Sequence, residues 1–144
     1  MSATEQSVII NRPVEEVRKF ISNIENAPKW DRGVLAGRQI SEGPLGVGAT
    51  LQTTRQMLGR RRTPKYLVSE YEPNRKIALK AFLGPLQGQV RFAFAPVNEG
   101  TRFTQSFEIE SSGLWNLITP FLVRMFTRDG EADLANIKRI LENG

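Results

Sequence analysis

Acid–base chemistry in this chain of 144 residues is limited to carboxylates, tyrosines, lysines and arginines, because the sequence contains no histidine and no cysteine. The lack of both residue types excludes a Ser-His-Asp triad, a thiolate nucleophile and any metal site built on histidine or thiolate ligands. Among these groups, we expect any catalysis to use a carboxylate, a tyrosine or an arginine. We predict neither a metal nor a cofactor.

Arg55 is the most informative of these groups, because period-two alternation places it with Leu51 and Thr53 on one face of a strand. A guanidinium that points inward needs a partner. Glu70 falls in register on the neighbouring predicted strand and can pair with Arg55. Alternatively, the head group of a ligand satisfies Arg55, or its side chain reaches solvent near the end of the hairpin. Arg55, Tyr66 and Glu70 are the candidates for a catalytic group, if the protein has one.

The other polar residues divide by their position in the pattern. Gln105 alternates with the apolar residues of its strand and is predicted to face inward. Glu108 and Glu110 have the opposite parity and are predicted to face solvent. Asp129 and Asp133, in the last segment of the chain, are also predicted to be solvated.

The elements that position these residues begin with an antiparallel meander. Short alternating segments with hairpin-length connections indicate strands near 34–42, 49–58, 64–72, 76–83, 88–96 and 101–110. The hairpin that turns at Asn98-Glu99 is predicted to pair two phenylalanine-rich faces, which carry Phe92, Phe94, Phe103 and Phe107.

A strand at Val8–Ile10 and a helix from Pro13 precede the meander, and a long helix follows it. Thr119-Pro120 can cap this last helix or kink it. We favour a kink inside a helix that runs from Leu114 to Glu142. The residues predicted to face the phenylalanines are Leu117, Phe121, Leu122 and Met125.

This order predicts one α+β domain over residues 1–144. We expect a helix-grip fold, in which a curved seven-stranded antiparallel sheet wraps around a long C-terminal helix and two short helices follow the first strand. Such a sheet leaves room for a cavity beneath the helix.

The net charge of +5 comes largely from a basic patch between residues 48 and 92. We interpret Arg60–Arg62 with Lys65 as a solvated hairpin tip and expect no nucleic-acid partner, because the patch lacks interleaved aromatic residues. The sequence shows no signal peptide and no apolar run that would span a bilayer, which predicts a cytoplasmic protein without stable membrane insertion. The segment 82–86 is apolar enough for transient membrane contact. No particular oligomeric state is predicted.

Several motifs resemble a known family, and the similarity covers nearly the whole chain. They are SVIINRPVEEV at 7–17, NAPKWD at 26–31, GVGA at 46–49, VSEYEP at 68–73, FAFAP at 92–96, GTRFT at 100–104 and LANIKRILE at 134–142. On these motifs the chain resembles the START/Bet v1-like superfamily, specifically its polyketide cyclase/dehydrase-type proteins, also called SRPBCC proteins.

The resemblance implies a cavity that binds a small hydrophobic ligand such as a lipid or a polyketide. We expect binding or transport of such a ligand. The alternatives are a polyketide cyclase/dehydrase-type enzyme that acts in the same cavity, and a protein-interaction or chaperone-like module. The residues expected to line the cavity are Trp30, Phe92, Gln105, Phe107, Leu117, Phe121 and Met125, with Arg55 as the ionic contact.

Overall fold

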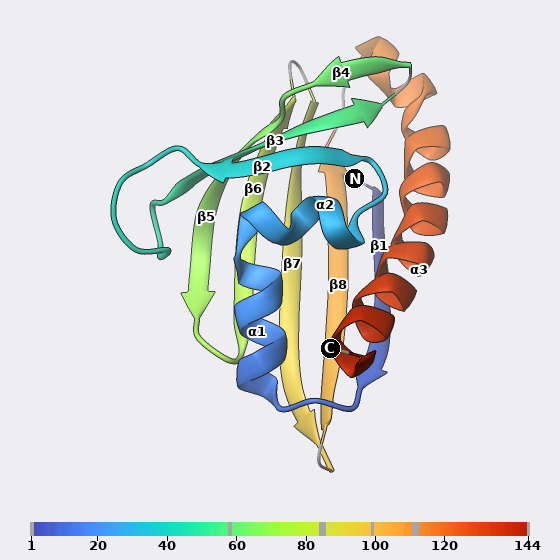
Figure 1. Cartoon of the computed structure of the whole chain (residues 1–144). Coiled ribbons are helices and arrows are strands. Elements are labelled where there is room, and N and C mark those ends of the chain that lie inside the picture. Colours follow the sequence, from blue (N-terminus) through green and yellow to red (C-terminus); the bar gives the residue numbers. More distant parts are fainter. Residues whose placement is uncertain (1, 58, 84–85, 99, 111–112, 144) are drawn as a thin grey trace.

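The computed structural model describes residues 2–57, 59–83, 86–98, 100–110 and 113–143. The helical elements are α1 (Val14–Ser22), η1 (Ile24–Asn26), α2 (Ala27–Trp30), η2 (Gly113–Leu117) and α3 (Thr119–Asn143) (Figure 1). The strands are β1 (Ser2–Ile10), β2 (Val34–Gln39), β3 (Thr50–Met57), β4 (Arg60–Arg62), β5 (Lys65–Glu72), β6 (Lys76–Leu83), β7 (Leu86–Val97) and β8 (Gly100–Glu110).

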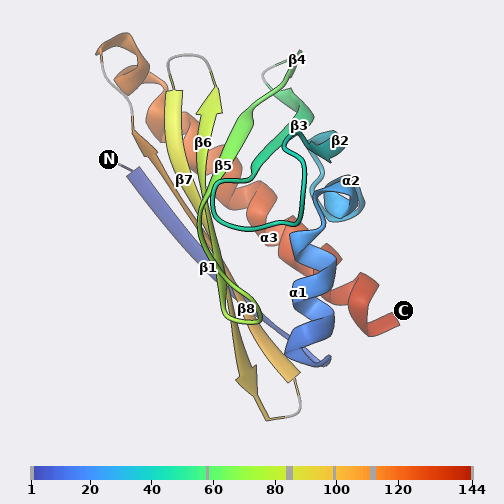
Figure 2. The same cartoon turned by 90° about the vertical axis from the view of Figure 1, so that its left-hand side faces the viewer.

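One curved antiparallel sheet contains all of these strands. Seven of them follow the order β1-β8-β7-β6-β5-β3-β2, and β4 pairs beside β3. In Figure 2, β1, β8, β7 and β6 lie along one side of the molecule, α1 and α2 lie on the other, and β2, β3 and β4 curve over toward α2. The predicted helix-grip architecture is confirmed, including the short helices after the first strand and the long C-terminal helix.

The hairpin of β7 and β8 carries the aromatic centre of the core. Phe94 and Phe103 are cross-strand partners, and their ring centroids lie 5.5 Å apart. Phe103 is fully buried and also stacks on Phe92 at 5.7 Å. Period-two alternation on two paired strands is sufficient to bring these rings to one face.

Three contacts fix α3 along β1. The side-chain Nε2 of Gln6 donates to the Thr127 carbonyl oxygen at 2.9 Å. Nearer the C-terminus, Lys138 Nζ donates to the Ile9 carbonyl oxygen at 2.6 Å. The backbone N–H of Asn11 donates to Glu142 Oε2 at 2.8 Å. These bonds set the rotation of α3 about its axis and decide which of its residues face the sheet.

The predicted kink at Pro120 is wrong. The long helix starts at Thr119, and η2 precedes it as a separate turn. Pro120 therefore lies in the first turn, where a missing N–H costs no hydrogen bond. As a result, Leu117 (78% exposed) and Phe121 (57% exposed) face solvent instead of the phenylalanines.

The basic tip at Arg60–Arg62 has more structure than a solvated turn. These residues form β4, which pairs with β3 so that Arg62 lies opposite Arg55. Arg60 and Arg61 are exposed, as expected, but Arg62 is half-buried. In the described part of the chain, no helix has the length and apolar character to cross a bilayer.

We predict that truncation of two phenylalanines on β8 lowers the free energy of unfolding by different amounts. Phe103→Ala should lower the free energy of unfolding by about 3–5 kcal/mol, because Phe103 is packed on all sides. Phe107→Ala should cost distinctly less, because Phe107 is only partly buried and borders a cavity. Urea unfolding of both variants measures the difference, and equal losses would contradict this account of the packing.

Candidate functional site

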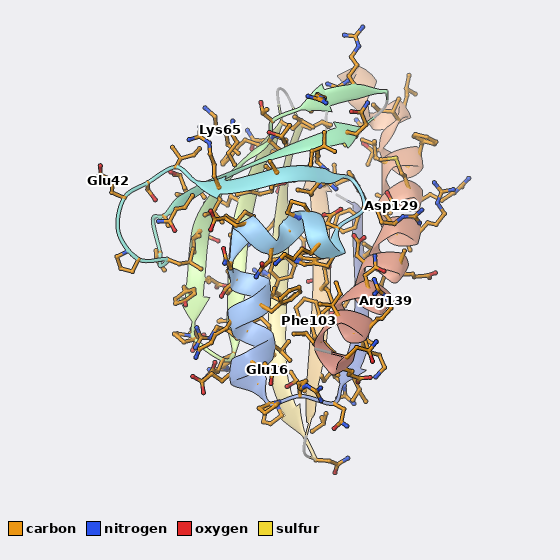
Figure 3. All side chains as sticks on the ribbon, viewed as in Figure 1. Glu16, Glu42, Lys65, Phe103, Asp129 and Arg139 are labelled. Atoms are coloured by element: carbon orange, nitrogen blue, oxygen red, sulfur yellow. The ribbon has the colours of Figure 1, made fainter. Side chains whose placement is uncertain are left out.

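A cavity of about 400 Å³ lies on the concave side of the sheet, beneath α2 and α3. Figure 3 shows side chains filling the space around Phe103, while Glu42 and Lys65 lie at the periphery. Most of the wall is apolar and comes from Ile21, Ile24, Ala27, Trp30, Val34, Met57, Pro64, Leu79, Ala81, Leu83, Leu86, Val90, Phe92, Phe107, Ile109, Leu122 and Phe126. The polar wall residues include Asp31, Thr53, Arg55, Arg62, Tyr66, Gln89, Gln105, Asp129 and Asp133.

Arg55 and Asp31 form an ion pair in this wall. Nη2 of Arg55 donates to Oδ1 of Asp31 at 3.1 Å and to Oδ2 at 3.3 Å, and the two side chains are 17% and 16% exposed. The guanidinium also lies 6.0 Å from the ring centroid of Phe126. Burial alone would lower the pKa of Arg55, but Asp31 and a hydrogen bond with Tyr66 outweigh burial and raise it. The arginine is thus charged and already neutralised by protein.

The predicted pairing of Arg55 with Glu70 is wrong. Strand β3 pairs with β5 so that Thr50 lies opposite Leu67 and Gln52 lies opposite Lys65, which places Glu70 beyond the start of β3. Glu70 instead lies 3.9 Å from Lys76, with both side chains substantially exposed. Arg55 lies beyond the part of β3 that pairs with β5, so a carboxylate on β5 does not reach it.

Asp133 is the strongest departure from a solvated carboxylate. Its side chain is only 3% exposed, and Oδ1 accepts the backbone N–H of Arg32 at 3.2 Å. Burial raises the pKa of Asp133 to about 7, and repulsion from Asp31 and Asp129 acts in the same direction. The expectation that Asp133 is solvated is wrong, because α3 turns this residue toward α2. Near neutral pH, Asp133 can donate or accept a proton.

Neutral polar groups complete the wall. The hydroxyls of Thr53 and Tyr66 lie 3.2 Å apart and share a hydrogen bond. Trp30 Nε1 and Gln105 Oε1 are buried and have no hydrogen-bond partner among the described residues. Buried polar atoms without partners are uncommon in proteins. They mark the places where a bound molecule can gain a hydrogen bond after a small rotation of the side chain.

The residues expected from the sequence divide into two groups. Trp30, Arg55, Phe92, Gln105 and Phe107 all lie in the cavity wall, as does Tyr66. Leu117, Phe121 and Met125 do not. The reason is the start of α3 at Thr119, which places a different set of helix residues toward the sheet.

The sequence interpretation missed Phe126 and the inward position of Asp133. Leu122, Phe126, Asp129 and Asp133 recur at intervals of three or four and share one face of α3. Ile137 continues that face and is fully buried. This spacing was the sequence signal that these residues share one inward face, although the two aspartates within it favoured a solvated face. The described residues include no cluster of three potential metal ligands.

Comparison with known proteins agrees with this geometry. The model of one protein family, described as polyketide cyclase/dehydrase and lipid transport, matches residues 1–142. The chain belongs to this family. Among curated proteins, no sequence matches the chain.

Solved structures share the fold at low sequence identity. The di-domain aromatase/cyclase BexL of the BE-7585A biosynthetic pathway superposes with a TM-score of 0.80 at 14% identity; the match covers 99% of this chain and 47% of BexL. This chain thus spans about half of that protein. The Zhui aromatase/cyclase from Streptomyces sp. R1128 has a TM-score of 0.78 at 14% identity, covering 98% of this chain and 93% of its own. A START superfamily protein from Mycobacterium smegmatis has a TM-score of 0.74 at 12% identity, and the match covers 96% of this chain and 98% of that protein.

The raised pKa of Asp133 predicts that stability falls as pH rises. The folded state holds the proton up to about pH 7, whereas the ordinary pKa of the side chain is 3.8. The contribution of Asp133 is therefore most favourable below about pH 4 and is lost by about pH 7, with a slope of roughly 1.4 kcal/mol per pH unit between these values. Asp133→Asn should remove this slope.

Urea unfolding between pH 4 and pH 8 measures the effect. The amide side chain in Asp133→Asn would keep an oxygen that accepts the backbone N–H of Arg32, so this variant should be more stable than the unmodified protein above pH 7. Glu131→Gln is the matched control, because Glu131 is exposed on the same helix. An unchanged slope in Asp133→Asn would contradict the assignment.

Proposed function

We propose that the protein binds and carries a small, uncharged hydrophobic molecule in the cavity beneath α2 and α3. The observation that carries this proposal is a mostly apolar cavity of about 400 Å³ in a domain of this size. Protein pockets for small molecules generally have such volumes and consist of an apolar wall with a few polar groups. The family description, which includes lipid transport, supports the same conclusion.

The charges in the wall argue for an uncharged ligand. Arg55 has Asp31 as its partner, so an anionic head group would have to displace that carboxylate. Asp129 and Asp133 lie in the same wall and would repel an anion. The other cation in the wall is Arg62, which is half-buried on β4 and donates to the Met57 carbonyl oxygen at 3.4 Å. Away from Arg62, an anion buried in this cavity would lack a cationic partner, which is costly. A hydroxyl or carbonyl group carries no such cost and can hydrogen-bond to Tyr66 or Gln105.

A matched pair of ligands tests the proposal. Decanol and decanoate have the same chain length and differ in charge. Decanol should bind at least about tenfold more tightly than decanoate. At a hundredfold excess over its dissociation constant, it should raise the free energy of unfolding by about 2.7 kcal/mol. Thermal unfolding and native mass spectrometry at neutral pH measure both effects.

Two tryptophan variants provide the control. Ala81 lines the cavity on β6, so Ala81→Trp should fill it and abolish decanol binding. Ala93 is exposed on β7, so Ala93→Trp makes the same chemical change outside the cavity and should leave binding intact. Tighter binding of decanoate, or no effect of Ala81→Trp, would contradict the proposal.

A second candidate function, a polyketide cyclase/dehydrase-type enzyme, is favoured by one observation. Asp133 titrates with a pKa of about 7 in the same wall as the Arg55–Asp31 pair. A protonated carboxyl group can transfer its proton to an oxygen of a bound substrate, and the guanidinium can stabilise negative charge that develops on a second oxygen. Asp31 would hold Arg55 in position. In this function, Arg55 stays a candidate and Asp133 replaces Glu70.

The enzyme proposal predicts a definite pH profile. Cyclisation of a supplied poly-β-carbonyl chain should slow as pH rises through about 7, because Asp133 loses its proton. Asp133→Asn should lower the rate by about 10²–10⁴-fold, while decanol binding persists. Product formation followed by mass spectrometry measures the rate. An Asp133→Asn variant with full activity, or an unmodified protein without turnover at any pH, would leave ligand carriage as the function.

A further inference from the structure

We infer that one end of the molecule docks on an anionic lipid bilayer, with the start of α3 as the inserting element. This end, which we call the α3 rim, consists of Leu117 and Phe121 with the exposed arginines Arg124 and Arg128. The inference goes beyond ligand binding, because a protein that carries a ligand does not need a membrane surface.

The apolar part of the α3 rim has no partner among the described residues. Leu117 is 78% exposed and Phe121 is 57% exposed, although both are large hydrophobic residues. Neighbouring exposed side chains of this kind mark interaction surfaces in soluble proteins.

The charge around these residues identifies the partner. Phe121, Arg124 and Arg128 are spaced by three and four residues, so they share one side of α3, and both arginines are exposed. Arg60 and Arg61 on β4 are also exposed. Figures 1 and 2 place β4, the start of α3 and the adjoining ends of β6 and β7 at the same end of the molecule.

Carboxylates only partly offset this positive charge. Among the described residues, the exposed acidic residues on the adjacent segments are Glu5 on β1, Glu110 at the end of β8 and Glu131 farther along α3. A helix that carries aromatic and aliphatic side chains beside arginines binds at the interface of anionic bilayers, with its apolar groups among the acyl chains. A nucleic acid would neutralise the charge of the arginines but would leave Leu117 and Phe121 without an apolar environment.

The cavity wall extends to this end of the molecule. Arg62 from β4, Leu83 and Leu86 from the β6–β7 hairpin, and Leu122 and Phe126 from α3 all belong to the wall. Phe121 and Leu122 are consecutive, so one residue faces outward while the next faces the cavity. A bilayer bound at the α3 rim would therefore lie beside the part of the cavity that these elements surround.

Vesicle co-sedimentation tests the inference. The full chain should bind vesicles made of equal parts phosphatidylcholine and phosphatidylglycerol, and should bind pure phosphatidylcholine vesicles much more weakly. The double variant Arg124→Gln/Arg128→Gln should reduce the partition coefficient by roughly 25-fold at low ionic strength, because each arginine near an anionic surface contributes about fivefold. The double variant Leu117→Ser/Phe121→Ser should reduce it by about tenfold or more.

The matched control changes the same residue types elsewhere. Leu35 on β2 is 47% exposed, and Arg139 is exposed toward the other end of α3, so Leu35→Ser/Arg139→Gln should bind vesicles like the unmodified protein. Equal loss in this control would overturn the inference, as would absence of binding to anionic vesicles. Self-association that Leu117→Ser/Phe121→Ser abolishes, seen by sedimentation velocity, would assign the surface to a second copy and would also overturn it.

Variants of the α3 rim and of the cavity distinguish a failure of membrane docking from a failure of ligand binding. Leu117, Phe121, Arg124 and Arg128 do not belong to the cavity wall. The α3 rim variants should therefore keep decanol binding unchanged. Conversely, Ala81→Trp should lose decanol and keep its affinity for vesicles.

Discussion

The rotation of α3 about its own axis is the constraint on which the site depends. The Gln6 side chain donates to the Thr127 carbonyl oxygen, the Ile9 carbonyl oxygen accepts from Lys138, and the Asn11 N–H donates to Glu142. The first strand and the residue after it therefore hold α3 at three points along its length. With the rotation fixed, Leu122 and Phe126 face the cavity, and Asp133 faces the end of α2. Gly130 allows this close approach, because a Cβ at position 130 would collide with the side-chain oxygen of Gln6. A helix rotated by a third of a turn would place different residues over the cavity.

The same rotation creates the electrostatics of the cavity. It brings Asp133 close to Asp31 and far enough from solvent that its pKa rises to about 7. Asp31, in turn, is engaged by Arg55 and is held at the end of α2 by the short helical segment that the sequence NAPKWD encodes. The three residues come from α3, from the residue that follows α2, and from β3, so the charge balance of the cavity exists only when the sheet and both helices are assembled.

Sequence patterns were sufficient where one local rule decided the outcome. Alternation alone placed Phe103 and Gln105 on the inner face, and the fold class followed from the order of the elements. Two predictions failed because a second local effect intervened. A proline in the first helical turn is better tolerated than one in the interior, which moved the start of α3 and turned Phe121 outward. The register of β3 on β5, in which Thr50 lies opposite Leu67, places Glu70 beyond the start of β3 and removed it as a partner of Arg55. The burial of Asp133 could not be predicted from its residue type, because it depends on the packing of α3 against α2.

The exposure of Phe121 and the burial of Leu122 are two results of the same packing arrangement. The face of α3 that contacts the sheet is occupied by the cavity and by the buried residues Leu134, Ile137 and Leu141. The first turn of the helix extends beyond this packed region, so its opposite face has no core to cover it. Burying one large apolar side chain contributes roughly 1.5–3 kcal/mol to the free energy of unfolding. The exposed Phe121 makes no such contribution. A surface that lacks this stabilisation and lies beside the exposed Arg124 and Arg128 of α3 is better explained by an external partner than by folding alone.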